Sequence, residues 1–165
     1  MKLFEPIKIG NVELKNRVIM APMENGMAEV GTGEVTDRII AFFEERAQHN
    51  IAMIMPGSIG VSPEGRGLPT QLSLFDEKQV AGHKRLVDAI HNKGSLVAAQ
   101  LYHAGRQASE AITGLDPLAP SAISCGILQN HPKEITHEQM DRIKEQFRQA
   151  ARWSIEAGYD IVEVH

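Results

Sequence analysis

Ile51 to Met55 (IAMIM) is an uninterrupted apolar run that follows directly on a helical pattern ending at Asn50. Such a run is typical of a strand covered on both faces, as the strands of a parallel sheet are. Upstream, Thr36 can cap a helix whose apolar positions recur at helical spacing, and Asn50 suits a left-handed exit from it. The positions on the inner face of this helix are Ile39, Ile40, Phe43 and Ala47.

A second helix and strand follow a Gly- and Pro-rich loop over Pro56 to Thr70. Asp76 and Gln79 form a capping box, and Gly94 suits the end of the helix. The run from Ser95 to Leu101 (SLVAAQL) then predicts the third strand. The residues expected to face inward from this helix are Val80, Leu86, Val87 and Ile90.

A third helix and a fourth strand come after a loop of about thirty residues, a length that usually indicates function. Thr136 and Gln139 form another capping box, Gly158 ends the helix, and Asp160 to His165 (DIVEVH) is the strand. The apolar stripe expected on this helix comprises Met140, Ile143, Phe147, Ala151 and Ile155.

The N-terminal region supplies a small hairpin and the first strand. Ile7 to Leu14 alternates apolar and polar residues about Gly10-Asn11, and Arg17 to Ala21 (RVIMA) is an apolar run stopped by Pro22. Strands and helices therefore alternate along the chain. This order predicts a parallel sheet with right-handed crossovers.

Two architectures compete, an open doubly wound sheet and a barrel. The loop Pro22 to Gly26 after the first strand lacks the G-x-G-x-x-G of a dinucleotide-binding unit, which favours the barrel. We therefore predict an α/β chain that forms the N-terminal part of a TIM (β/α)8 barrel, with about four parallel strands, three helices and a capping hairpin. A complete barrel needs about 250 residues. Unpaired edges at the first and fourth strands would then favour a homo-oligomer or association with the missing half.

Composition excludes several classes of function. The 165 residues carry a formal net charge of -4 without a basic stripe, so nucleic acid and membrane partners are not expected. Cys125 is the only cysteine, which excludes a disulfide framework and fits a reduced, cytoplasmic setting. The seven histidines form neither an H-x-x-x-H pair nor a Cys/His cluster, so no metal site is expected. The N-terminus lacks a signal-peptide core, and no stretch has the length of a membrane span.

In barrels of this kind the reactive groups lie at the carboxyl ends of the strands and in the loops after them. Polar groups from four strand ends should therefore converge on one face. The residues at these positions are Pro22, Met23 and Glu24 after the first strand, Gly57 and Ser58 after the second, Gln100, Tyr102, His103 and Arg106 near the end of the third, and His165 at the end of the fourth.

Several motifs at these positions resemble the old yellow enzyme family, and they occur in family order along the whole chain. The branch that they resemble most contains 2,4-dienoyl-CoA reductase and related NADH:flavin oxidoreductases. The motifs are Leu3-Phe4-x-Pro6-x-x-Ile9-Gly10, Leu14-Lys15-Asn16-Arg17-Val18, Ala21-Pro22-Met23, Ser62-Pro63-Glu64-Gly65, Gln100-Leu101-x-His103-Ala104-Gly105-Arg106, Pro117-x-Ala119-Pro120-Ser121-Ala122 and Ala157-Gly158-Tyr159-Asp160-x-Val162-Glu163-Val164-His165.

The resemblance implies an FMN site at the top of the barrel, with residues 1–165 as the N-terminal half of the flavin-binding domain. It places the loop Pro22, Met23 and Glu24 beside the flavin, Ser58 where a backbone approaches the ring, and Gln100 at the flavin's polar edge. An amide suits that edge because it offers both a donor and an acceptor.

For the reaction, the resemblance implies that His165 holds the carbonyl oxygen of an α,β-unsaturated substrate, an enone or an enoyl thioester, with Tyr102 in the same pocket. Hydrogen bonds to that oxygen make the β-carbon open to hydride. NADH or NADPH would be the reductant. Tyr102 could instead simply pack, and His103 and Arg106 could serve only to shape the third loop.

Glu24 departs from the family pattern, since many members have Thr, Cys or His there. An ionised carboxylate cannot donate a hydrogen bond to the flavin, so we expect either a raised pKa of Glu24 or a low flavin potential. The second carbonyl-binding residue and the phosphate site of the family lie downstream of His165, so we expect the chain alone to be inactive. An iron–sulfur cluster is expected only on downstream cysteines. The alternative is a non-catalytic half-barrel without flavin.

Overall fold

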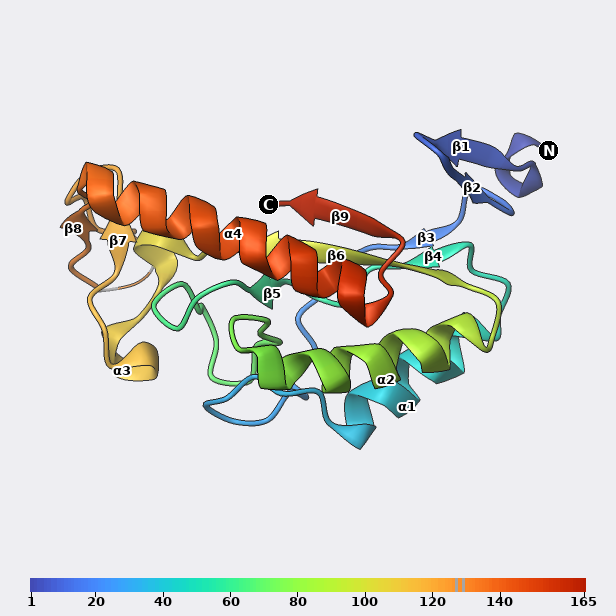
Figure 1. Ribbon diagram of the computed structural model, residues 1–165, viewed down its shortest axis with the longest axis horizontal. Coiled ribbons are helices and arrows are strands. Elements are labelled where there is room, and N and C mark those ends of the chain that lie inside the picture. The colour runs from blue at the N-terminus through green and yellow to red at the C-terminus, as the bar shows by residue number, and fades with distance from the viewer. Residues whose placement is uncertain (127, 129) are drawn as a thin grey trace.

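The computed structural model describes residues 1–126, 128 and 130–165, and a parallel sheet runs through its centre (Figure 1). Its strands are β3 (Ile19–Met20), β4 (Met53–Ile54), β6 (Leu96–Tyr102) and β9 (Ile161–Val164), side by side in that order and all parallel. The four predicted strands are confirmed, although β3, β4 and β9 are shorter than the stretches that predicted them.

A further short strand, β5 (Ile59–Gly60), lies in the loop after β4 and had not been predicted. Both β4 and β5 pair in parallel with the same edge of β6. Strand β4 pairs with its beginning and β5 with its end. An isolated bridge joins Gly60 to Ser73, which ties both ends of this loop to the sheet. The sheet stays open, and its two edge strands are β3 and β9.

Three long helices cover the sheet, with α2 in contact with both of the others (Figure 1). They are α1 (Asp37–Ala47), α2 (Val80–His91) and α4 (His137–Ala157). The side chain of Thr36 caps α1, and Thr136 with Gln139 forms the predicted capping box of α4. The capping box of Asp76 and Gln79 opens a 3-10 turn, η2 (Glu77–Gln79), that leads into α2.

The main hydrophobic core lies between the sheet and the helices. Strand β6 contributes Val97, Ala99 and Leu101 to it, and Phe43 and Leu86 contribute from the helices. The remaining residues of β6 point to the other face, because successive side chains of a strand alternate. This alternation gives the opposite face of the sheet its own, smaller set of residues.

The smaller core lies at the beginning of the strands and is covered by the hairpin of β1 (Ile7–Ile9) and β2 (Val12–Leu14). Leu14 is fully buried there against a cluster that includes Met53 and Ala98. Gly10 in the turn has a φ of 58°, a left-handed conformation that glycine adopts without strain. The hairpin therefore caps the end of the sheet away from the predicted reactive residues, as expected.

The described part of the long segment between β6 and α4 contains four short elements. A 3-10 turn, η1, precedes the N-terminal hairpin. The pair β7–β8 is parallel. The elements are η1 (Lys2–Phe4), η3 (Gly105–Gln107), α3 (Glu110–Thr113), β7 (Leu118–Ala119) and β8 (Lys133–Glu134).

One prediction about α4 was wrong. Ile155 was expected to face inward, but it is 70% exposed. The residues of α4 that are buried are Ala150, Ser154 and Ala157, so small side chains face the core and the helix is rotated from the orientation that its larger apolar residues suggested. No described helix has the length and apolarity needed to cross a membrane.

Candidate active site

The two longest strands present polar side chains on the face opposite the helices. Because Val97, Ala99 and Leu101 point to the main core, Gln100 and Tyr102 point the other way. Gln100 is buried and its amide nitrogen donates to Glu163 of β9 over 3.2 Å, across a register pair of the sheet. The structure thus places the predicted Gln100 on the face of the sheet opposite the helices.

Tyr102 and His165 form the next pair along these strands. Their ring centroids are 5.7 Å apart, and their planes are tilted by 30°. The backbone N–H of His165 donates to the carbonyl of Leu101 over 2.9 Å, which continues the sheet ladder to the last residue. The predicted substrate residues Tyr102 and His165 are therefore in contact.

The loops after β3 and β4 approach each other through their backbones. A Cβ atom on Gly57 would lie 2.5 Å from the carbonyl oxygen of Met23, a distance that no real Cβ shows. Only glycine at position 57 permits this approach. The side chain of Met23 is 60% exposed, and Pro22 before it is half-buried.

A chain of hydrogen bonds joins these two loops at Glu24. The Ser58 hydroxyl donates to Oε1 of Glu24, and Nε2 of Gln71 donates to Ser58 Oγ over 2.6 Å. The same Nε2 lies 3.4 Å from Oε1 of Glu24. The backbone N–H of Gly67 donates to Oε1 of Gln71 over 2.8 Å. Sequence analysis missed Gln71, which is almost fully buried although no local pattern distinguishes it from the other glutamines.

The surrounding protein shifts the acidity of two groups at this position. Desolvation raises the pKa of Glu24, and contacts with Ser58 and Gln71 oppose that rise. The Glu24 side chain is nevertheless exposed, and solvent screening weakens this shift. Desolvation, with the negative charge of Glu24, also raises the pKa of Tyr102. The raised pKa expected for Glu24 is therefore supported.

Glu24, Ser58 and Tyr102 line one cavity of about 300 Å³. Its other lining residues are Gly67, Leu68, Gln71, Gln107, Cys125 and Leu128. A larger cavity of about 750 Å³ is lined by His165 together with His103, β7 and the beginning of α4. No residue of the loops after β3 and β4 lines the larger cavity, whereas Glu24 and Ser58 line the smaller one. The smaller cavity therefore better fits the predicted chemistry. Tyr102 lines the smaller cavity, His165 lines the larger one, and their rings are in contact.

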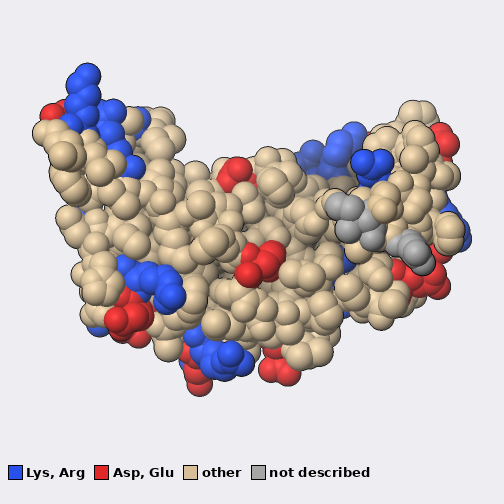
Figure 2. Space-filling model, turned by 180° about the vertical axis from the view of Figure 1, so that it is seen from behind, with Lys and Arg blue, Asp and Glu red and all other residues tan. Residues whose placement is uncertain are grey.

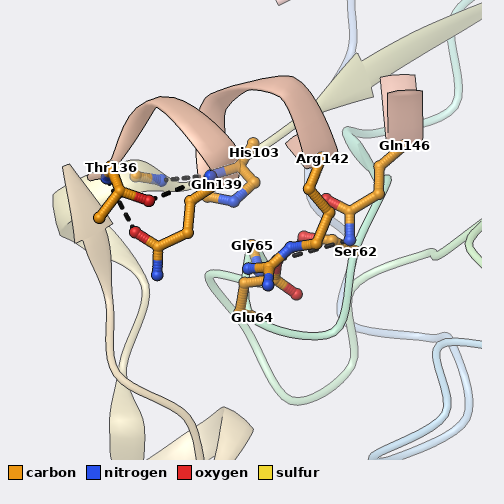
Figure 3. Close-up of polar contacts among 9 residues, drawn as sticks. Ser62, Glu64, Gly65, His103, Thr136, Gln139, Arg142 and Gln146 are labelled. Carbon is orange, nitrogen blue, oxygen red and sulfur yellow. Dashed lines mark hydrogen bonds and ion pairs between the residues drawn. The ribbon is translucent and has the colours of Figure 1, made fainter. Parts of the chain in front are cut away.

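A second polar cluster joins the loop after β5 to α4 and to the segment after β6 (Figure 3). Glu64 is buried and pairs with Arg142 of α4 over 3.2 Å. A Cβ on Gly65 would lie 2.5 Å from the ring of His103, so this loop lies directly against that ring. Nδ1 of His103 accepts from the N–H of Gly105. These contacts favour the loop-shaping role for His103.

Arg106 contributes to the third loop through its backbone, because its carbonyl accepts a hydrogen bond from the side-chain amide of Asn130. Its own side chain is exposed. The structure therefore brings together Glu24, Ser58, Tyr102 and His165, whereas Arg106 lies outside this group.

The donor set fits the polar edge of a flavin. Among the described residues nothing donates to the amide oxygen of Gln100, so this buried amide keeps an acceptor for a ligand N–H. The backbone of Met23 and Glu24 is held in place by Gly57, and Ser58 lies beside it. No cluster of metal-binding side chains occurs among residues 1–126, 128 and 130–165.

The surface carries no concentrated charge on the face seen from behind. Figure 2 shows Lys and Arg side chains interspersed with Asp and Glu over a largely uncharged surface, and the outline is hollowed between the two ends of the molecule. This distribution agrees with the absence of a basic stripe in the sequence.

Comparisons with known proteins identify one family and one fold. The profile of the NADH:flavin oxidoreductase / NADH oxidase family matches residues 2–165. The chain is 36% identical over 165 residues to the NADH oxidase of Thermoanaerobacter brockii and 34% identical over 164 residues to the NADPH dehydrogenase of Bacillus subtilis (strain 168), covering 99% of this chain in both cases. It covers 25% of the former relative and 48% of the latter.

Among solved structures, the Old Yellow Enzyme from Pichia sp. AKU4542 superimposes with a TM-score of 0.89 at 30% sequence identity. That comparison covers 99% of this chain and 45% of the other. The chain thus spans from a quarter to about half of the length of the relatives that it matches.

Proposed function

The chain belongs to the NADH:flavin oxidoreductase / NADH oxidase family, with the fold of an N-terminal part of an old yellow enzyme barrel, and we propose that it contributes the flavin edge and part of the substrate pocket of an FMN-dependent ene-reductase. The observation that carries this proposal is the convergence of Glu24, Ser58 and Tyr102 on one cavity, with His165 against Tyr102. NADH or NADPH would be the reductant, and the cytoplasm the setting.

In this proposal Gln100 would hold the polar edge of the flavin, and the backbone from Pro22 to Glu24, with Ser58, would lie beside the ring. When bound, FMN supplies the hydride-transfer chemistry. The imidazole of His165 would donate to the carbonyl oxygen of an enone or enoyl thioester and so draw charge away from the β-carbon. Tyr102 would form the wall behind His165 and limit which substrates fit.

The open edges at β3 and β9 bear on how such a site is completed. Ile19 on β3 is 39% exposed and Val164 on β9 is 74% exposed. We expect the remaining strands of a barrel, or a second copy of the chain, to pair there. The chain alone would then bind FMN weakly and show no turnover.

The test is FMN affinity, measured by quenching of flavin fluorescence, for residues 1–165 alone and together with a segment that supplies the remaining strands of the barrel. We expect binding and a visible flavin spectrum only with that segment. Tight binding by the 165 residues alone would contradict the expected incompleteness. Absence of binding in both forms would favour the alternative, a half-barrel that serves as a structural module.

A further inference from the structure

The hydrogen-bond chain that ends at Glu24 has a defined direction. A backbone N–H is only a donor, so Oε1 of Gln71 must face Gly67 and its Nε2 must face Ser58. Ser58 accepts from this amide and donates its single hydrogen to Oε1 of Glu24. Every donor in the chain therefore points toward Glu24.

This direction decides which carboxyl oxygen of Glu24 can be protonated. Oε1 receives the Ser58 hydrogen and lies 3.4 Å from the Gln71 amide nitrogen. A proton on Oε1 would displace the hydrogen bond that Ser58 donates to that oxygen, so we expect an acid proton of Glu24 on Oε2. We propose that Gln71 is a positioning residue: through Ser58 it fixes Oε1 of Glu24 as an acceptor and leaves Oε2 as the oxygen that carries the acid proton.

Burial supports a fixed role for Gln71. The residue is only 1% exposed, and both ends of its amide are bonded. Burying an amide is unfavourable unless its hydrogen bonds are made, so the three partners hold it in one orientation. The loop that supplies Gly67 and Gln71 thus sets the orientation of a carboxyl group on a different loop.

This proposal rests on the proposed function only in naming the ligand that Glu24 would contact, the flavin. With the acid proton on Oε2, Glu24 can donate a hydrogen bond toward a ligand in the cavity, which an ionised carboxylate cannot do. Other titratable groups that line this cavity are Tyr102 of β6 and Cys125 of the long loop. The positioning itself is a property of this chain without any ligand.

The test is an NMR titration of Glu24 in the 165-residue chain, with 13C-labelled glutamate and no flavin. Gln71→Met removes the amide but keeps its length, so Glu24 loses its contact with Gln71 and Ser58 loses the donor that orients its hydroxyl. We expect Glu24 to become a weaker acid, with its dissociation constant lowered roughly threefold or more. Gln107→Met makes the same chemical change in the same cavity without a bond to Glu24 and should leave the titration unchanged.

A second variant tests the route and guards against misfolding. Ser58→Ala removes the hydroxyl that links Gln71 to Glu24, at a less buried position than Gln71. It should shift the Glu24 titration in the same direction. The double variant should shift it by less than the sum of the two single shifts, because Gln71 contacts Glu24 directly but also orients the Ser58 hydroxyl. An unchanged Glu24 titration in folded Gln71→Met, or a fully additive double variant, would overturn the proposal. The titration uses no flavin, so a chain that does not bind FMN would still test this proposal.

Discussion

The rings of Tyr102 and His165 lie 5.7 Å apart with their planes tilted by 30°, although Tyr102 ends β6 and His165 directly follows β9. The contact follows from the parallel register of β6 and β9, which pairs Leu101 with Val164 just before it. Tyr102 also lines the cavity that contains Glu24. A single aromatic residue therefore connects the proposed carbonyl-binding histidine with the acidic loop.

Glu24→Gln should make Tyr102 easier to ionise. Part of the rise in the pKa of Tyr102 comes from the negative charge of Glu24, and the neutral amide removes that charge. An alkaline titration of the 13C-labelled tyrosine rings would show the midpoint of Tyr102 falling. Tyr159, which is buried against His83, provides the internal control, and an equal shift of both tyrosines would point to a general loosening of the fold.

Gly57→Ala should separate the first two loops. The added Cβ would lie 2.5 Å from the carbonyl oxygen of Met23, so the backbone must move. Overpacking of this kind lowers the free energy of unfolding by about 1–3 kcal/mol. Urea denaturation measures this loss. Gly126→Ala is the matched control because a Cβ there meets no atom of the described residues within 4 Å. Equal stability of both variants would mean that the approach of the loops is not tight.

His83 should make the stability of the protein depend on pH. The ring is fully buried, its Nε2 lies 3.0 Å from the carbonyl oxygen of Ser73, and its Nδ1 lies 2.8 Å from the Tyr159 hydroxyl. Because a carbonyl only accepts, Nε2 carries the proton and Tyr159 donates to Nδ1. Burial lowers the pKa of His83 from 6.5 to about 4.

Between these two values the unfolded chain binds a proton that the folded protein does not, so stability falls as the pH falls. The full contribution is present above pH 6.5, and roughly 3 kcal/mol of it is lost by pH 4, at about 1.36 kcal/mol per pKa unit. Chemical denaturation at a series of pH values measures the slope. His83→Gln keeps a donor and an acceptor but cannot be charged, and an unchanged slope in this variant would assign the effect to other groups.

Arg142→Ala should destabilise the protein more than Glu64→Gln does. Arg142 is about half exposed, whereas the side chain of Glu64 is 9% exposed, so loss of the arginine leaves a buried carboxylate without its counter-ion. Breaking such a pair costs several kcal/mol when both charges are buried. Solvent reaches Arg142, so we expect about 1–3 kcal/mol.

Urea denaturation of the two single variants and of the double variant separates the causes. In the double variant the penalty of Arg142→Ala should largely disappear, because no charge remains at position 64. Arg148→Ala, on the exposed face of the same helix with Glu145 as its partner, controls for helix propensity. A penalty that persists in the double variant would mean that Arg142 contributes by packing.

The repeating pattern of caps and apolar runs was sufficient to predict the main strands and helices, because these depend on local signals. Asn50, for example, adopts the predicted left-handed conformation with a φ of 59°. The orientation of α4 could not be derived in this way. Ile155 fits the apolar stripe by spacing, but the small residues Ala150 and Ser154 allow a closer approach to the core.

The candidate site was predictable wherever a residue ends a strand, since strand ends meet at one edge of a parallel sheet. Tyr102 and His165 are of this kind. Gln71 and the pairing of Glu64 with Arg142 depend on how a loop folds back over the sheet, which no local period encodes. Long-range polar contacts made by loop residues could thus not be predicted from the sequence.

In the FMN-loaded protein, Glu24 should make the flavin reduction potential more dependent on pH. Desolvation raises the pKa of Glu24 above its ordinary value of 4.5, so the carboxyl is neutral at low pH and ionises at a higher pH than usual. A negative charge beside the flavin opposes the charge added on reduction. The potential of the natural protein should therefore fall below that of Glu24→Gln as Glu24 ionises.

Spectroelectrochemical titration of both proteins over a range of pH values measures this difference. The two curves should coincide at low pH, where both side chains are neutral, and separate as the pH rises through the pKa of Glu24. Ser58→Ala removes a contact that favours the ionised form of Glu24. Its curve should have the same shape as that of the natural protein, but it should separate from the Glu24→Gln curve at a higher pH. Curves that stay parallel at every pH would place Glu24 too far from the flavin for its charge to act, and the proposed position of the first loop beside the ring would then be wrong.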